Sequence, residues 1–248
     1  MKKRYKEKER VAEKKNMEIL QRIPPRHPKW NVWQGLFLLL LISLIEFPLG
    51  WLRTPDDLDQ MKGFLRFFSV GLGEVILYFV VVLVFFKLIR RPVRELGLVR
   101  PRARYIFLGV LMGGFLFVAV GLLGNFLARW LGTPAPQSFT LVVKGASYNW
   151  QFFLLLVLGG ILAPLKEEVF FRGIFYPPLR NVYGRGQGIL FTASIFALLH
   201  FDVVRFIPLF VGGVVLTWIY EKTSSLWPAI LAHGTWNVLM ALALWIQR

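Results

Sequence analysis

Two adjacent carboxylates and an arginine close the fourth apolar segment of this sequence, and together they could carry out acid–base chemistry. On a helix, Glu168 and Arg172 are four residues apart and share a face, so the arginine can neutralise that carboxylate. Glu167 is turned about 100° away and lacks this partner. Poor solvation raises the proton affinity of an unpaired carboxylate, which suits a general base working near neutral pH. A charge pair at the membrane interface is the structural alternative for the same residues.

Two further pairs of residues are also four positions apart. Phe196 and His200 lie at the end of the fifth apolar segment, and His233 and Asn237 lie within the seventh. A single histidine at a helix end, or one polar pair between helices, would be ordinary packing. Two histidines on separate membrane segments beside a carboxylate pair instead favour one shared site, because polar and ionisable side chains in lipid are costly.

The combined set could hydrolyse an amide bond without a covalent nucleophile. A glutamate and a histidine could position and deprotonate a water molecule, while a histidine and an asparagine on another helix donate hydrogen bonds to the developing oxyanion. The chain has no cysteine, which excludes a thiolate nucleophile, a disulfide and a cysteine-based metal site. Two histidines and a glutamate could alternatively hold a catalytic zinc ion, but there is no HExxH helix. We therefore predict an enzyme without a metal or other cofactor.

The three motifs resemble those of the CAAX protease and bacteriocin-processing family of intramembrane glutamic endopeptidases, also called the Abi family. The EExxxR motif of that family matches Glu167–Arg172, its FxxxH motif matches Phe196–His200, and its HxxxN motif matches His233–Asn237. All three occur in the family's order and on hydrophobic segments. The resemblance covers about residues 150–237, which we treat as the catalytic motif core.

This resemblance implies a role for each residue. Glu167 and His200 would activate the water, and His233 and Asn237 would form the oxyanion hole. Three residues would support the site: Glu168, Arg172 and Phe196. The substrate would be a protein or peptide, prenylated for some family members and a peptide precursor or membrane protein for bacterial ones. We expect an integral protein of a prokaryotic cell membrane.

Seven apolar segments must position these residues. The first, residues 32–52, is long enough to span roughly 30 Å of hydrocarbon as a helix. A long basic segment precedes it and no small-residue cleavage site follows, so we do not expect a cleaved signal peptide. The other segments are residues 64–89, 105–130, 150–171, 188–201, 206–220 and 226–246. We predict an all-α polytopic transmembrane bundle of seven or eight helices, with a buried catalytic cavity formed by the fourth, fifth and seventh segments.

Composition and charge also indicate a membrane protein. The chain is 56% hydrophobic over 248 residues, more than a soluble domain of this size needs, so lipid must surround most of its surface. The net charge of +16 is concentrated in particular loops, which favours membrane lipids rather than nucleic acid as a partner. Residues 1–30 carry 11 Lys and Arg and residues 87–104 carry seven, so both should face the cytoplasm. We divide the chain into a basic cytosolic tail, residues 1–30, and a transmembrane domain, residues 31–248.

Other polar and small residues within the apolar segments have structural interpretations. Gly109 and Gly113 form a GxxxG pair that permits close approach of another helix. The glycine-rich stretch 184–188 has no preceding strand and does not fit a phosphate-binding spacing, so we interpret it as a turn. Glu46 and Glu74 are expected to form hydrogen bonds within the bundle.

Two questions stay open at this level. Simple alternation of crossings puts Glu167 nearer the cytoplasm and His200 toward the outer end of a short segment, although one site requires them to meet. We predict that Pro164 kinks the fourth helix and that the fifth segment tilts steeply, unless the chain crosses eight times. The alternative to an enzyme is a membrane-embedded regulator or immunity-type binding protein, which would not need an intact set of acid, base and oxyanion residues.

Overall fold

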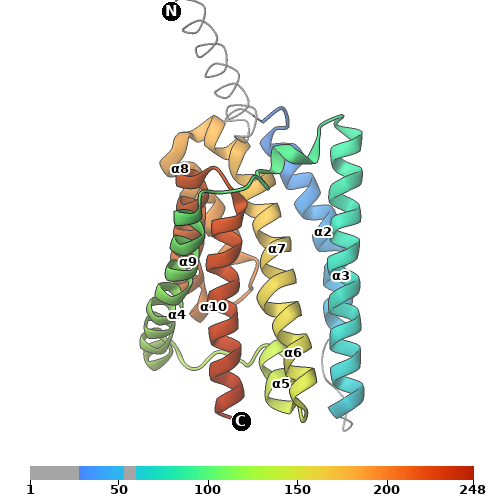
Figure 1. Ribbon diagram of the computed structural model, residues 1–248, viewed down its shortest axis with the longest axis vertical. Coiled ribbons are helices and arrows are strands. Elements are labelled where there is room, and N and C mark those ends of the chain that lie inside the picture. The colour runs from blue at the N-terminus through green and yellow to red at the C-terminus, as the bar shows by residue number, and fades with distance from the viewer. Residues whose placement is uncertain (1–27, 53–59) are drawn as a thin grey trace, which may run out of the picture.

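Helices form most of the protein. The computed structural model describes residues 28–52 and 60–248, and within these ranges it contains no strand. The long apolar helices are α2 (Val32–Leu52), α3 (Gln60–Leu88), α4 (Ala103–Leu131), α9 (Val203–Thr223) and α10 (Leu226–Ile246). Each of these five is long and apolar enough to cross a membrane. They pack with the broken helix described next into a bundle, which confirms the predicted all-α membrane architecture (Figure 1).

The fourth apolar segment forms a long rod of consecutive helical elements. These are α6 (Asn149–Val157), η2 (Leu158–Leu162), α7 (Ala163–Glu168), η3 (Val169–Phe175) and the first part of α8 (Tyr176–Leu198). Both η2 and η3 are π-helical, and each precedes prolines, namely Pro164 and the pair Pro177 and Pro178. A proline has no N–H and its ring clashes with the carbonyl group four residues earlier, a conflict that a wider π turn relieves. The disturbance that the sequence predicts at Pro164 therefore takes the form of π turns.

A bend inside α8 brings Glu167 and His200 to a similar depth. Gly184 has φ 77° and ψ 176°, a conformation essentially restricted to glycine, and the chain reverses there. The rod therefore continues past Phe171, where the sequence prediction ended it. Glu167 lies 16 residues before position 183, about 24 Å along the helix, and His200 lies 15 residues after position 185, roughly 22 Å along the returning arm. Because the two arms on either side of Gly184 are nearly equal in length, Glu167 and His200 lie at a similar depth. Simple alternation of crossings had placed them at different depths.

Two short helices occupy connections for which the sequence predicted only loops. They are η1 (Val93–Leu96), between α3 and α4, and α5 (Ser138–Gly145), between α4 and α6. In Figure 1 the α3–α4 connection and the bend in α8 lie at one end of the bundle, and α5 and the C-terminus lie at the other. The predicted basic tail, residues 1–30, lies almost wholly outside the described residues.

Glycines allow α10 to approach its neighbours at backbone distance. At Gly109 and Gly113 of α4, an added Cβ would lie 2.6 and 2.5 Å from carbonyl oxygens of α10. A Cβ at Gly234 of α10 would lie 2.5 Å from the carbonyl oxygen of Gly160 in the rod. The GxxxG pair is therefore a packing contact, as predicted, and α10 is held between α4 and the rod.

We expect Gly113→Ala to lower the free energy of unfolding by about 1–3 kcal/mol, because the new methyl group meets backbone and must push the helices apart. Gly114→Ala is the matched control, since a Cβ there has nothing within 4 Å. Thermal unfolding in detergent should show a lower midpoint for Gly113→Ala and an unchanged or slightly higher one for Gly114→Ala. Equal midpoints for the two variants would contradict the close approach of α4 and α10.

Candidate active site

A buried ion pair within the rod forms the centre of the site. Arg172 Nη1 lies 2.8 Å from Glu168 Oε1, and both side chains are fully buried. Arg172 also donates through Nε to Thr217 Oγ1 at 3.3 Å and through Nη2 to the carbonyl oxygen of Gly213 at 3.2 Å. The pair that the helical spacing predicted is therefore present. The arginine additionally joins η3 to α9.

Two aromatic rings cover the guanidinium group of Arg172. Its Cζ lies 4.9 Å from the ring centroid of Phe196 and 5.7 Å from that of Phe171. Aromatic faces at these distances attract a cation, and the attraction is larger where water is excluded. Phe196 thus contacts the ion pair directly and helps to fix its position.

His233 on α10 binds the same carboxylate, and this contact determines its tautomer. Its Nδ1 lies 2.8 Å from Glu168 Oε1. An ionised carboxylate only accepts hydrogen bonds, so Nδ1 carries a proton and donates it. The other ring nitrogen, Nε2, faces Glu167 Oε2 at 3.9 Å. That distance is too long for a direct hydrogen bond but short enough for electrostatic coupling.

Glu167 is the carboxylate that the ion pair leaves accessible. Its side chain retains 29% of its exposed area, whereas that of Glu168 retains none. The neighbouring Lys166 forms a separate ion pair with Glu46 of α2, with Nζ and Oε1 2.9 Å apart. This contact confirms the expectation that Glu46 bonds within the bundle. Two adjacent carboxylates therefore have different environments, as a 100° step around the helix requires.

His200 follows directly after α8 and is anchored by its own turn. Its Nδ1 lies 2.8 Å from the carbonyl oxygen of Phe196, and its ring packs edge-on against the Phe196 ring at a centroid distance of 5.0 Å. A carbonyl oxygen can only accept, so Nδ1 is the donor and a neutral His200 presents the lone pair of Nε2. The spacing of four between Phe196 and His200 thus sets which ring nitrogen is available for chemistry.

Asn237 reaches across from α10 to the π-helical part of the rod. Its Nδ2 donates to the carbonyl oxygen of Gly159 at 2.9 Å. In η2 the N–H of Ala163 bonds to the carbonyl of Leu158, so the next such bond would come from position 164. Proline at that position has no N–H, which leaves the Gly159 carbonyl to a side-chain donor. One N–H of the Asn237 amide remains for another acceptor.

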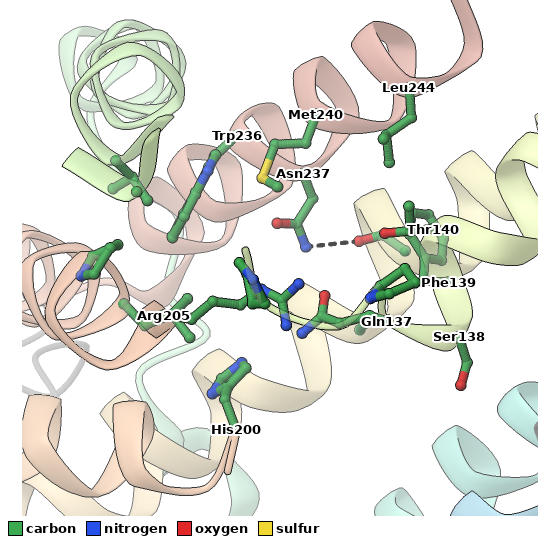
Figure 2. Close-up of a pocket in the computed structure, with 18 of the residues that line it drawn as sticks. Gln137, Ser138, Phe139, Thr140, His200, Arg205, Trp236, Asn237, Met240 and Leu244 are labelled. Atoms are coloured by element: carbon green, nitrogen blue, oxygen red, sulfur yellow. Dashed lines mark hydrogen bonds between the residues drawn. The ribbon is translucent and has the colours of Figure 1, made fainter. Parts of the chain in front are cut away.

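The four polar residues that the resemblance assigns to catalysis line one cavity of about 970 Å³: Glu167, His200, His233 and Asn237. Phe196 also lines it, whereas Glu168 and Arg172 lie behind its wall. Figure 2 shows His200 and Asn237 directed into this cavity from different segments. The structure thus brings the predicted set together and separates it into an accessible group and a buried pair.

The described residues give little support to the zinc alternative. Within residues 28–52 and 60–248, no three His, Asp or Glu side chains are grouped as ligands of one metal ion. His233 uses Nδ1 for Glu168, which leaves only its Nε2 available to a metal ion.

The sequence did not point to several residues that complete the site. Thr217 and Gly213 hold Arg172, and Trp236 lines the cavity beside His233 with ring centroids 5.8 Å apart. The indole Nε1 of Trp236 is buried without a hydrogen-bond partner among the described residues. The only local signal for the first two was a threonine four residues after a glycine in an apolar helix, which is common in membrane segments.

A comparison with protein families identifies residues 149–239 as matching the family described as type II CAAX prenyl endopeptidase, Rce1-like. The matched range contains all three motifs. This match confirms the resemblance that the motifs indicated.

Comparison with curated proteins finds two distant relatives. The chain is 25% identical over 89 residues to "Putative membrane peptidase YdiL" of Bacillus subtilis, a match that covers 36% of each chain. It is 26% identical over 80 residues to "UPF0177 protein YxdF" of Lactococcus lactis, which covers 32% of this chain and 44% of that protein. The similarity therefore spans less than half the length of these relatives. No solved structure matches the chain.

We expect Glu168→Gln to lower the free energy of unfolding by about 3–5 kcal/mol, because it leaves the charge of Arg172 buried and unpaired. Glu167→Gln is the matched control, since it makes the same chemical change at the accessible neighbour and should leave the unfolding midpoint nearly unchanged. The double variant Glu168→Met with Arg172→Leu should be less destabilised than Glu168→Gln, because it removes both charges. Denaturant unfolding of the three variants in detergent measures these differences, and equal losses for both glutamine variants would contradict the assigned environments.

Proposed function

We propose, from the match of residues 149–239 to the type II CAAX prenyl endopeptidase family, that this chain is an intramembrane endopeptidase with Glu167 as its general base. The observation that carries the proposal is the presence of all three motifs around one cavity. A peptide bond held in this cavity would have a carboxylate, two imidazoles and an amide within reach. The set contains no serine, threonine or cysteine, and in this proposal water is the attacking group.

The charges of the cluster support Glu167 in this role. Glu168 and Arg172 neutralise each other, which leaves Glu167 facing His233 Nε2. Net charge is costly in a poorly solvated site. The neutral combinations are an ionised Glu167 with a protonated His233, or a protonated Glu167 with a neutral His233. The first of these provides both a carboxylate that can accept a proton and an Nε2–H that can donate a hydrogen bond.

The reaction then follows from the positions of these groups. Glu167 accepts a proton from water as the water oxygen attacks the carbonyl carbon of the peptide, and His200 Nε2 accepts a hydrogen bond from the same water. The oxyanion that forms is stabilised by His233 Nε2–H and by the remaining N–H of Asn237. Glu167 returns its proton to the departing amine, which breaks the carbon–nitrogen bond and restores the starting charges.

The substrate in this proposal is a protein or peptide that reaches the site within the membrane. The family description names a CAAX prenyl endopeptidase, and one relative is named a membrane peptidase. The motif resemblance adds peptide precursors and membrane proteins as candidate substrates. We propose that the N-terminus faces the cytoplasm of a prokaryotic cell, on the basis of the basic residues in the tail and in the α3–α4 connection.

We expect Glu167→Ala to abolish the new peptide termini that the wild-type protein produces in membranes, because it removes the carboxylate that faces His233 Nε2. Mass-spectrometric comparison of termini in membranes containing either protein measures the effect and identifies the substrate. A prenylated cysteine at the cleaved position would select the CAAX class of substrate. Glu95→Gln is the matched control, since this carboxylate pairs with Arg91 outside the cavity.

A zinc chelator separates the proposal from its rivals in the same experiment. Termini that require Glu167 and survive chelation would support metal-independent proteolysis. Their loss on chelation would favour a zinc protease. Identical termini with the wild-type and Glu167→Ala proteins would instead favour a membrane-embedded binding protein.

We expect Asn237→Ala to slow cleavage by about 10²- to 10³-fold, the usual cost of losing one oxyanion-hole donor. The variant also loses the hydrogen bond to Gly159, so its unfolding midpoint is measured beside the rate of appearance of the termini. A purely structural role would lower the midpoint and leave the rate of the folded fraction intact. That result would remove Asn237 from the oxyanion hole.

A further inference from the structure

The two ends of the bundle carry different charge. The connection between α3 and α4 contains five arginines, Arg90, Arg91, Arg94, Arg100 and Arg102, whereas the connection between α4 and α6 contains a single basic residue, Lys144. Basic residues in short loops remain on the cytoplasmic side. The end of the bundle that holds α5 and the C-terminus is therefore the outer end (Figure 1).

The cavity extends from the site to this outer end. Its lining includes Gly50 at the end of α2, Ala128 near the end of α4, Gln137 before α5, Arg205 at the start of α9 and Gln247 after α10. All of these lie toward the end that holds α5 and the C-terminus. Among the described residues, the α3–α4 connection and the bend of α8 contribute nothing to the lining. Figure 2 shows Gln137 and Arg205 between His200 and the helix that carries Asn237.

Packed structure closes the cytoplasmic end. The α3–α4 connection docks on the start of α10, where Ser225 Oγ donates to the carbonyl oxygen of Val99 at 2.6 Å and the Leu226 N–H donates to that of Gly97 at 2.9 Å. A Cβ at Gly173 of the rod would lie 3.0 Å from the carbonyl oxygen of Leu96. The fully buried ion pair lies between this connection and the cavity. The α3–α4 connection therefore covers this end of α10 and of the rod.

The outer part of the cavity has the chemistry of a peptide-binding surface. Between apolar residues such as Phe139 and Leu244, its lining carries uncharged hydrogen-bonding side chains: Asn125, Thr133, Gln137, Ser138, Thr140 and Gln247. An extended peptide presents backbone N–H and C=O groups that need partners once water is displaced.

We infer that the substrate enters from the outer face of the membrane, as an extended peptide segment of an exported or membrane protein. This inference rests on the proposed proteolytic function of the cavity and specifies its substrate class. The segment would lie along α10 from Gln247 to Asn237, with its scissile bond beside Glu167.

Single-cysteine variants test the side of entry, because the chain has no cysteine of its own. Gln137→Cys places a thiol at the outer mouth, and Arg102→Cys places one at the opposite end. The two positions are matched, since both are exposed N-cap residues whose side chains make no capping hydrogen bond. Intact cells that express the full chain are treated with a bulky, membrane-impermeant maleimide, with permeabilised cells as the labelling control.

We expect Gln137→Cys to be labelled in intact cells and Arg102→Cys only after permeabilisation. Labelling of Gln137→Cys should also abolish the Glu167-dependent termini, while Arg102→Cys labelled after permeabilisation should retain them. Labelling of Arg102→Cys in intact cells would overturn the inference by reversing the orientation. Continued cleavage by fully labelled Gln137→Cys would overturn it by excluding this mouth.

The labelling result does not depend on whether the protein is a protease. If Glu167→Ala produced the same termini as the wild-type protein, the proteolytic function would fail, but the pattern of labelling would still report the side on which the cavity opens.

Discussion

The ion pair between Glu168 and Arg172 is the interaction on which the site depends. Neither charge has access to water, so each is tolerated only because the other neutralises it. Arg172 also donates through Nε to Thr217 of α9, and Glu168 Oε1, which already accepts from Arg172, accepts a second hydrogen bond from His233 of α10. A single buried charge pair therefore joins the rod to two other helices. This linkage explains why the accessible groups, rather than the pair itself, are free to do chemistry.

The same network of hydrogen bonds fixes the orientation and the tautomer of His233. Because Glu168 Oε1 accepts the hydrogen bond of Nδ1, the ring can turn only Nε2 toward the cavity and toward Glu167. His200 is fixed in the same sense by the Phe196 carbonyl, although through a local contact within one turn. In both histidines Nδ1 donates a hydrogen bond to an oxygen atom, and Nε2 is the ring nitrogen that faces the cavity.

The π-helical turns of the rod have a second structural effect. Pro164 removes a backbone donor in the interior of a membrane helix, where an unsatisfied carbonyl is expensive. Asn237 supplies a donor to Gly159 from another helix, and Gly160 and Gly234 permit the close approach that this bond requires. Pro164, which disrupts the rod, therefore also creates the acceptor that positions the Asn237 amide at the cavity wall.

The sequence by itself determined the spans, the three motifs and the pairs within them. Hydropathy identifies membrane helices because lipid excludes polar backbone, and spacing by four identifies neighbours on one helix because the α-helix repeats every 3.6 residues. These rules gave the Glu168–Arg172 pair and the different environment of Glu167. The same rules ended the fourth segment too early, at Phe171. Prolines follow this residue, and they would break an ideal α-helix, whereas the π turn before them lets this helix continue.

The motifs predicted one shared site, but only the tertiary structure decided which atoms of different helices make contact. The contacts of Arg172 with Thr217, of Glu168 with His233 and of Asn237 with Gly159 join positions 45, 65 and 78 residues apart. No periodicity relates such positions, because their approach depends on the reversal at Gly184 and on the glycines that set the distances between helices. The end at which the cavity opens was likewise beyond the sequence, since it follows from how loops pack over the helix ends and not from the composition of any one segment.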